Sequence, residues 1–337
     1  MNNLFIVPLP PPLHGASFYS QLIIEKFCDK KDDVFKTTIN SDIFLIKFFE
    51  IINQFFKLIF LALKNYHKIY YVAGNTKKTL LRDLIVFILF YRKDLIIHFH
   101  NKNNFNWFIN FLLIGSLIKN KTSIILSQSL ENDFLYTDSN KRVFIKNGLI
   151  DVSDDSLKKI SKPIKIGFLS NFILDKGVVE VINFFNFIIE RDCDAELYMH
   201  GIEYDISVSE LKSYLSEKSK NKVKINGNGI FESEKNNFFK NIDVFIFPTK
   251  NDCLPTVLLE AQMFSVPVLT TNEGAVSDII QDNFNGSTKF SNNNEYNYGL
   301  FNEIIKNYRF YSKNSRNNFK NNFNIEKFYL EMRNILS

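Results

Sequence analysis

The chain has 337 residues, which is too long for one ordinary α/β core and fits two domains of middling size. Hydrophobic residues make up 45% of it, so two real cores can be buried. The net charge of +5 is modest, and the sequence has no Lys/Arg-rich block or aromatic RNA-binding signature, so we expect no nucleic-acid partner.

The first half of the chain alternates predicted strands with predicted helices. Short apolar or β-branched runs indicate the strands, and apolar residues at helical spacing indicate the helices. This alternation is typical of a mostly parallel sheet with helices on both faces. Strands are expected at Leu4–Pro8, Ile69–Ala73, Leu95–His100 and Ser123–Ser127, and helices after the loop Leu9–Gly15 and over 44–64, 77–91 and 105–119.

A polar segment, Leu149–Lys165, separates the two halves of the chain. It carries aspartates and lysines close together and has a proline near its end, so we interpret it as a linker between domains. We predict an N-terminal domain over residues 1–155 and a second domain over 156–312. A C-terminal helical segment over 313–337 is expected to pack back toward the first domain.

The same alternation restarts after the linker. Two successive α/β halves predict a ligand-binding cleft at their junction, facing the carboxyl ends of both sheets. Strands are expected at Ile164–Leu169, Ala195–Met199, Lys222–Ile225, Val244–Pro248 and Pro267–Thr271, and helices over 176–190, 206–218, 232–240 and 255–264.

The stretch Asp243–Gly286 is the most informative for chemistry. A buried strand and a loop lead to a helix that opens with Pro255, where proline is well tolerated. The free N–H groups and partial positive charge of such a helix start suit a diphosphate. Asp252 stands just before the helix and Glu260 lies on it eight residues later, and carboxylates accept hydrogen bonds from a ribose diol or a sugar edge. Taken as an isolated pair, they would instead indicate a loop cap and a solvated helix residue.

This stretch, NDCLPTVLLEAQMFSVPVLTTNEGAVSDIIQDNFNG, resembles the signature of the large family-4 group of retaining glycosyltransferases with the GT-B fold. The family pattern is an acidic residue, seven others and a glutamate, followed by a strand and a Gly-containing loop. The family usually has Glu at the first acidic position and Gly shortly after, whereas this chain has Asp252 followed by Cys253 and Leu254. The resemblance implies an α/β fold of two Rossmann-like domains that face each other across a deep cleft.

Other motifs in the second half fall in the family's order. The segment IGFLSNFILDKGVVEVI looks like the first strand and loop of the donor domain, which implies that Lys176 contacts the donor's diphosphate. The Arg that the family often has five residues earlier is Asn171 here. The segments HGIE, with Gly201, and INGNGIF, with Gly229, look like the loops that flank the nucleotide base.

Two motifs in the first half also resemble the family. The segment LPPPLHGAS, with Gly15, resembles the loop that approaches the donor phosphates or the acceptor. In IIHFHNKN, His100 matches the histidine that faces the donor sugar.

The resemblance implies retaining transfer from a nucleotide-diphosphate sugar, with a UDP-sugar preferred, and without a metal or another cofactor. The sugar would be positioned by Asp252 and oriented by His100, the ribose held by Glu260, and the phosphates contacted by Lys176 and Thr256. We assign no covalent protein nucleophile. The implied catalytic residues are Asp252 and His100, and the implied donor-binding residues are Lys176, Thr256, Glu260, Gly15, Gly201, Gly229, Leu254, Pro255 and Asn171.

Three other interpretations stay open. A nucleotide-sugar epimerase of the GT-B fold would need a further acid/base set, and none is evident. A periplasmic-type sugar-binding protein would need a signal peptide, which we do not find at the N-terminus. An inactive glycosyltransferase subunit would fit the departures at Asp252 and Asn171.

Two short motifs raise the question of a metal site. His98 and His100 form a His-x-His pair, but no carboxylate or cysteine lies nearby at ligand spacing. Asp192-Cys-Asp194 is similar to a metal-binding Asp-x-Asp, but it precedes a predicted strand rather than following one. We therefore expect no metal site.

The sequence also bears on location. Its three scattered cysteines point to a reducing cytoplasm, and charges interrupt the apolar stretch Phe44–Leu63, so we expect no membrane span. The acceptor is expected to be a glycan or a polyprenyl-diphosphate-linked oligosaccharide. Helix 44–64 is either packed on the N-terminal sheet or a surface that rests on the anionic inner face of the plasma membrane. Its apolar residues at helical spacing are Phe48, Ile52, Phe55, Phe56, Ile59, Phe60 and Leu63, interleaved with Lys47, Lys57 and Lys64.

Overall fold

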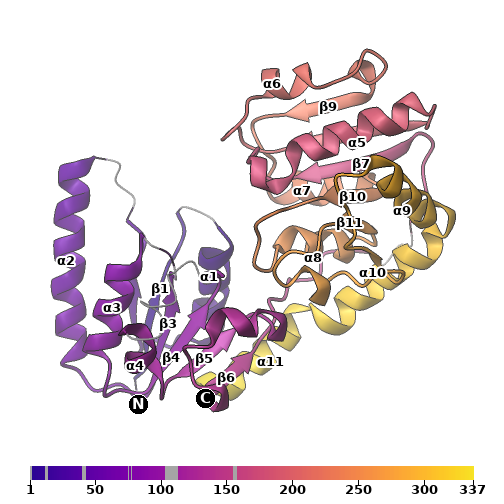
Figure 1. Cartoon of the computed structure of the whole chain (residues 1–337). Coiled ribbons are helices and arrows are strands. Elements are labelled where there is room, and N and C mark those ends of the chain that lie inside the picture. The colour runs from indigo at the N-terminus through magenta and orange to yellow at the C-terminus, as the bar shows by residue number, and fades with distance from the viewer. Residues whose placement is uncertain are drawn as a thin grey trace. The chain divides into compact units, whose positions relative to one another are not determined.

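The computed structural model describes residues 2–11, 14–39, 43–74, 76, 78–102, 113–154 and 158–337. The chain divides into two compact units (Figure 1). The first consists of Met1–Asn147 together with Phe328–Ser337, and the second of Gly148–Lys327. Each unit contains its own parallel six-stranded sheet, as the alternation of strands and helices predicted.

The sheet of the first unit has the strand order β2-β1-β3-β4-β5-β6, and all its ladders are parallel. The central strands are buried along their whole length, because helices cover both faces of a parallel sheet. The two outer strands, β2 and β6, were not predicted. The strands are β1 (Leu4–Val7), β2 (Asp33–Lys36), β3 (Ile69–Ala73), β4 (Leu95–Phe99), β5 (Thr122–Ile125) and β6 (Arg142–Phe144).

Figure 1 shows α2, α3 and α4 on one side of this sheet and α1 on the other. The His14 side chain and the backbone of Ser17 form the N-terminal cap of α1, and the end of α11 packs beside α1, with the Phe328 ring 5.7 Å from that of Tyr19. Most of the helix predicted over 105–119 lies outside the described residues. The helices are α1 (Gly15–Phe27), α2 (Phe44–Ala62), α3 (Leu80–Leu89), α4 (Gly115–Ile118) and α11 (Ile325–Leu336).

The sheet of the second unit has the order β12-β11-β10-β7-β8-β9 and is also parallel. Five of its strands lie where the sequence predicted them. Helix α6 is shorter than the predicted 206–218. The elements are β7 (Ile164–Leu169), α5 (Val178–Glu190), β8 (Ala195–His200), α6 (Val208–Ser213), β9 (Val223–Asn226), α7 (Glu232–Asn241), β10 (Val244–Phe247), α8 (Thr256–Met263), β11 (Val268–Thr270), β12 (Gly286–Ser287), α9 (Asn294–Lys306) and α10 (Tyr308–Asn322).

Polar contacts tie the predicted linker to the second unit. Arg316 pairs with Asp151, with 2.7 Å between Nη2 and Oδ2. Lys158 donates hydrogen bonds to the carbonyl oxygens of Phe239 and Ile242, at the end of α7, and burial lowers the pKa of its ammonium to about 7. The expected boundary between residues 155 and 156 lies outside the described residues.

The C-terminal helices are divided between the two units. Helix α10 packs on α8 in the second unit, where Asn318 donates a hydrogen bond to Gln262 at 2.7 Å. Residues 328–337 belong to the first unit. Among the described residues, none of the helices has the length and apolar character that crossing a bilayer requires.

Candidate active site

The candidate site lies at the carboxyl edge of the second sheet, where β10 leads through a loop into α8. Pro255 occupies the N-cap position, and Thr256 is the first helical residue, so the helix starts one residue later than predicted. No side chain caps this start, and its first N–H groups have no partner within the helix. Leu254, in the loop just before the helix, is buried. An uncapped helix start of this kind suits an anion.

Lys176 and Asp252, identified from two separate motifs, form an ion pair in this loop. The Nζ of Lys176 lies 2.7 Å from the Oδ2 of Asp252 and donates a second hydrogen bond to the Asn251 carbonyl at 3.0 Å. The Thr249 hydroxyl donates to the same carboxylate oxygen at 2.9 Å. Asp252 is thus held from two sides through its Oδ2, and no described residue donates a hydrogen bond to its Oδ1.

The turn after β7 brings Lys176 to this position. Gly177 follows it with φ of +77°, and a Cβ there would lie 2.3 Å from the Pro248 carbonyl oxygen at the end of β10. A side chain at this position would push the two loops apart and would strain the backbone. Because β7 and β10 are neighbouring strands, this close approach sets the lysine beside the loop that carries Asp252.

The second carboxylate, Glu260, forms an ion pair with Lys235 of the neighbouring helix α7. The Glu260 side chain is only 13% exposed, and its burial raises the pKa of the carboxyl while the ammonium of Lys235 opposes that rise. Sequence reasoning missed Lys235. Its only signal was a lysine in the first turns of the helix after β9, and nothing in the sequence relates that position to Glu260.

The loops after β7 and β8 approach each other closely beside this site. A Cβ on Gly201 would lie 1.8 Å from the Ser170 carbonyl oxygen, so only glycine fits there. Gly229, with φ of +71°, donates its N–H to the Gly201 carbonyl at 3.2 Å. Asn171 is exposed on the β7 loop, and its carbonyl accepts a hydrogen bond from Ile173 at 2.7 Å. The structure thus brings the predicted glycine loops to the same sheet edge as Lys176.

In the first unit, His100 is buried at the end of β4 beside His98. Their ring centroids are 4.1 Å apart, and the Tyr19 ring stacks on His100 at 6.0 Å. The Tyr70 hydroxyl lies 2.5 Å from the Nδ1 of His98. Burial lowers the pKa of His98 well below its usual value and that of His100 to about 3, so both rings are neutral near pH 7. Neither Nε2 has a hydrogen-bond partner among the described residues.

Gly15 is the first residue of α1. A Cβ at this position would meet no described atom within 4 Å, so packing among the described residues does not require glycine there.

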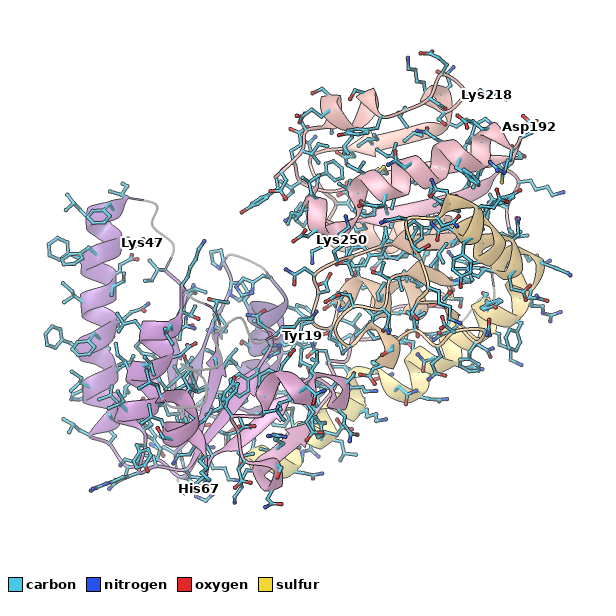
Figure 2. The ribbon with its side chains drawn as sticks, in the orientation of Figure 1. Tyr19, Lys47, His67, Asp192, Lys218 and Lys250 are labelled. Carbon is cyan, nitrogen blue, oxygen red and sulfur yellow. The ribbon has the colours of Figure 1, made fainter. Side chains whose placement is uncertain are left out.

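The two motifs that raised the metal question gain no further ligands among the described residues. Within the part of the chain that the structure describes, no group of three or more His, Cys, Asp or Glu side chains is placed to hold a metal ion. Asp192 lies in the turn before β8, where Lys218 approaches its Oδ1 at 3.5 Å. Figure 2 shows this pair at the opposite edge of the second unit from Lys250, which follows β10.

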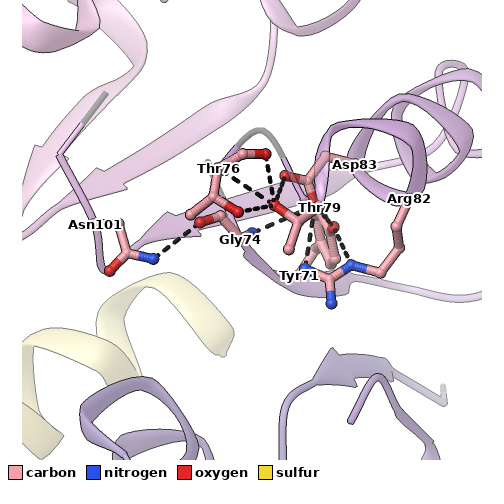
Figure 3. A network of polar contacts seen from close by, with 7 residues as sticks. All are labelled: Tyr71, Gly74, Thr76, Thr79, Arg82, Asp83 and Asn101. Atoms are coloured by element: carbon pink, nitrogen blue, oxygen red, sulfur yellow. Dashed lines mark hydrogen bonds and ion pairs between the residues drawn. The ribbon is translucent and has the colours of Figure 1, made fainter. Parts of the chain in front are cut away.

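A polar network centred on Asp83 holds the loop after β3 in the first unit (Figure 3). The Asp83 carboxylate is 1% exposed and accepts hydrogen bonds from the Tyr71 hydroxyl, from the Gly74 N–H at 3.3 Å and from the Thr79 hydroxyl at 3.2 Å. Asn101 donates to the Gly74 carbonyl at 2.9 Å. The network therefore links the β3 loop to the residue that follows His100.

Comparison with known proteins supports a transferase. The sequence model described as "Glycosyl transferases group 1" matches residues 150–324. A curated relative, the capsular polysaccharide biosynthesis glycosyltransferase CapM of Staphylococcus aureus, is 31% identical over 135 residues, which cover 40% of this chain and 33% of the relative. The matched part is about a third of that relative's length.

Solved structures share the whole fold. HepE of Anabaena in complex with UDP has a TM-score of 0.76 at 16% identity over 100% of this chain and 99% of that one. A glycosyltransferase from Rickettsia africae has a TM-score of 0.73 at 15% sequence identity, over 99% of this chain and 97% of that one. Sucrose-phosphate synthase of Thermosynechococcus elongatus has a TM-score of 0.74 at 12% sequence identity, over 99% of this chain and 98% of that one. The predicted GT-B type of α/β fold is confirmed.

Proposed function

The chain belongs to the Glycosyl transferases group 1 family, and from this we propose that it transfers a sugar from a nucleotide-diphosphate sugar to a glycan or lipid-linked oligosaccharide. We further propose that it is a retaining enzyme of the family-4 group and needs no metal ion. One observation carries the proposal. Two carboxylates, Asp252 and Glu260, each paired with a lysine, flank an uncapped helix start at the carboxyl edge of a parallel sheet.

We propose a UDP-sugar as the donor. HepE, which shares the fold, has been solved with UDP and with UDP-glucose. In this chain, the Glu260 carboxylate would accept hydrogen bonds from the ribose hydroxyls. The loops at Gly201 and Gly229 would flank the base through backbone groups, since glycine leaves room for a close approach. Asn171, on the neighbouring β7 loop, would complete the donor contacts.

The diphosphate would lie at the start of α8. Its oxygens would accept hydrogen bonds from the free N–H groups after Pro255 and from the Thr256 hydroxyl, with the Lys176 ammonium neutralising their charge. As the bond between the sugar's anomeric carbon and the phosphate oxygen breaks, negative charge grows on the leaving diphosphate. The same groups would stabilise this charge in the transition state.

The sugar would be positioned by Asp252 and oriented by His100. The Asp252 carboxylate is fixed by Lys176 and Thr249, so it can accept hydrogen bonds from sugar hydroxyls at little entropic cost. His100 is neutral and carries a buried Nε2 without a partner among the described residues, which suits a hydrogen bond with a hydroxyl. The acceptor hydroxyl would attack the face that the nucleotide leaves. In the first unit, Gly15 would let the donor phosphates or the acceptor approach the start of α1.

The acceptor class rests on the relative. The name of CapM refers to capsular polysaccharide biosynthesis. We propose that this chain likewise acts in making a cell-surface polysaccharide, at the cytoplasmic side of the plasma membrane, with a growing glycan or a polyprenyl-diphosphate-linked oligosaccharide as acceptor.

A thermal-shift screen against UDP, GDP, ADP and their sugar conjugates, with EDTA present, tests the donor site. A ligand at about 100 times its dissociation constant stabilises the native state by roughly 2.7 kcal/mol, which raises the melting temperature by a few degrees. We expect a shift with uridine nucleotides that Glu260→Ala abolishes. The control Glu190→Ala, at an exposed glutamate that ends α5, should keep it. No shift with any nucleotide would contradict the proposal, and anomeric inversion of the free donor without acceptor would favour an epimerase.

A further inference from the structure

Helix α2 has an apolar face that the first unit does not cover. Of its 19 residues, only Leu58 is buried. Large apolar side chains are exposed instead: 66% of the surface of Phe49 is accessible, 63% of that of Phe56 and 80% of that of Leu63. Figure 2 shows ring side chains projecting from α2 on the side away from the sheet. The outer stripe, spaced three or four residues apart, consists of Leu45, Phe49, Ile52, Phe56, Phe60 and Leu63.

The side of α2 that faces the unit is partly polar. Gln54 donates a hydrogen bond to the Lys36 carbonyl of β2 at 3.4 Å, and Glu50 lies one turn earlier on the same side. A helix that packs on a soluble core shows the reverse arrangement, with apolar residues inward and polar residues outward. Helix α2 thus contacts the first unit through Leu58 and Gln54, as the first alternative from the sequence requires, but most of its phenylalanine rings take no part in that packing.

Charge favours a negatively charged partner. Lys47 and Lys57 are exposed and form no ion pair with a described residue, and Glu50 is the one acidic residue in the α2 sequence. The first unit contains 20 Lys and Arg against 12 Asp and Glu, a net charge of +8, whereas the second contains 21 against 24, a net charge of −3. The modest net charge of the chain thus hides a basic unit, and α2 belongs to it.

We propose that the outer stripe of α2 is a docking surface for an anionic lipid bilayer. The helix would lie in the plane of the interface, with its phenylalanine rings at the boundary between headgroups and acyl chains. The ammonium group of Lys57, which flanks the stripe, would reach the lipid phosphates.

A second copy of the chain fits this surface less well. Two copies that packed stripe to stripe would bring together two first units, each with a net charge of +8. Like charges that face each other across an apolar contact oppose association. A bilayer of anionic lipids instead supplies a negative charge for each lysine.

Sedimentation with vesicles tests the proposal. We expect the protein to pellet with vesicles of phosphatidylcholine and phosphatidylglycerol at low salt, and much less with phosphatidylcholine alone. Phe49→Glu with Phe56→Glu should weaken binding at least a hundredfold, since each ring contributes about tenfold or more. Lys57→Gln should weaken it about fivefold, since a cation near an anionic surface contributes about that factor.

Two controls keep the test decisive. Phe310→Glu changes an exposed ring on the second unit, at 52% of its surface, and should leave vesicle binding unchanged. If the double glutamate variant does not fold, Phe49→Ser with Phe56→Ser replaces it, because this pair removes the rings without adding charge. Nucleotide-induced thermal shifts should be the same in all α2 variants, which separates this result from the donor site.

The outcomes that overturn the proposal are clear. A wild-type protein that stays in the supernatant with anionic vesicles would refute it. A second outcome would also refute it: light scattering shows a wild-type dimer, the α2 substitutions convert it to a monomer, and the wild type binds no vesicles. The outer stripe would then be an interface between copies of the chain.

Discussion

The ammonium of Lys176 lies 2.7 Å from the carboxylate of Asp252, although the two residues are 76 positions apart. In the absence of donor, Asp252, which we propose to position the sugar, therefore forms an ion pair with Lys176, which we propose to contact the diphosphate. A bound diphosphate would share this lysine with Asp252. Donor binding and sugar positioning would thus be coupled through one ammonium group.

The first prediction concerns that coupling. Replacing Lys176 by Ala should weaken UDP binding by about 10- to 100-fold, because a hydrogen bond to a charged group contributes about 1.5–3 kcal/mol. Titration calorimetry measures the change. Lys250→Ala, at a more exposed lysine that pairs with Glu180, is the matched control and should bind UDP as the wild type does. Equal affinity in Lys176→Ala would remove this lysine from the donor site.

The second prediction concerns Lys235, whose ammonium opposes the rise that burial causes in the pKa of the Glu260 carboxyl. Without this ammonium, only burial would act on the pKa of Glu260, so the pKa should rise above its already raised value. A protonated carboxyl is a poorer acceptor for ribose hydroxyls. UDP affinity of Lys235→Ala should therefore fall as the pH is lowered, starting at a higher pH than in the wild type.

UDP dissociation constants between pH 5 and 8 give this profile. Lys240→Ala, on the exposed side of the same helix, should leave it unchanged. A uniform loss of affinity at every pH in Lys235→Ala would show that Lys235 contacts the nucleotide directly rather than acting through Glu260.

The third prediction concerns the buried histidine pair. The folded pKa of His100 is about 3, below the value of about 6.5 expected in the unfolded chain. The unfolded state therefore takes up protons first as the pH falls, and the free energy of unfolding decreases below about pH 6.5. Between pH 6.5 and 5 the loss should be about 2 kcal/mol for His100, and His98, whose pKa is also lowered by burial, adds to it. Urea unfolding of the wild type and of His100→Asn at pH 7.5 and 5 measures it, and an identical pH dependence would contradict the account.

The fourth prediction concerns Asp83 at the centre of the network in Figure 3. Asp83→Ala leaves a buried hydroxyl and backbone N–H without their acceptor and removes the partner of Arg82. It should cost about 3–5 kcal/mol of unfolding free energy in the first unit. Asp94→Ala, at an exposed aspartate before β4, should change stability by less than about 0.5 kcal/mol. Calorimetric melting compares the two variants.

The sequence predicted the central strands of both sheets because they are buried on both faces and read as continuous apolar runs. It missed β2 and β6, since edge strands are half exposed and mix polar with apolar residues. The carboxylates and Lys176 were found through motifs along the chain. The Lys235–Glu260 pair and the Asp83 network join separate elements, and no local pattern encodes such contacts.

The outward-facing phenylalanines of α2 show a different limit. Their spacing predicted an amphipathic helix, and α2 spans 44–62 as expected. Periodicity does not reveal which side of a helix faces the protein. Only the contacts of Gln54 and Leu58 with the unit settle that question.

The most direct test of the central claim is UDP release from UDP-sugars in the presence of EDTA and a lipid-linked or polysaccharide acceptor, compared between the wild type and Asp252→Asn. The account predicts acceptor-dependent release by the wild type and a turnover lowered by about a hundredfold or more in the variant, because Asp252 acts on the sugar in the transition state. The UDP dissociation constant should change far less. Full turnover by Asp252→Asn, or no consumption of any nucleotide sugar by the wild type, would contradict it.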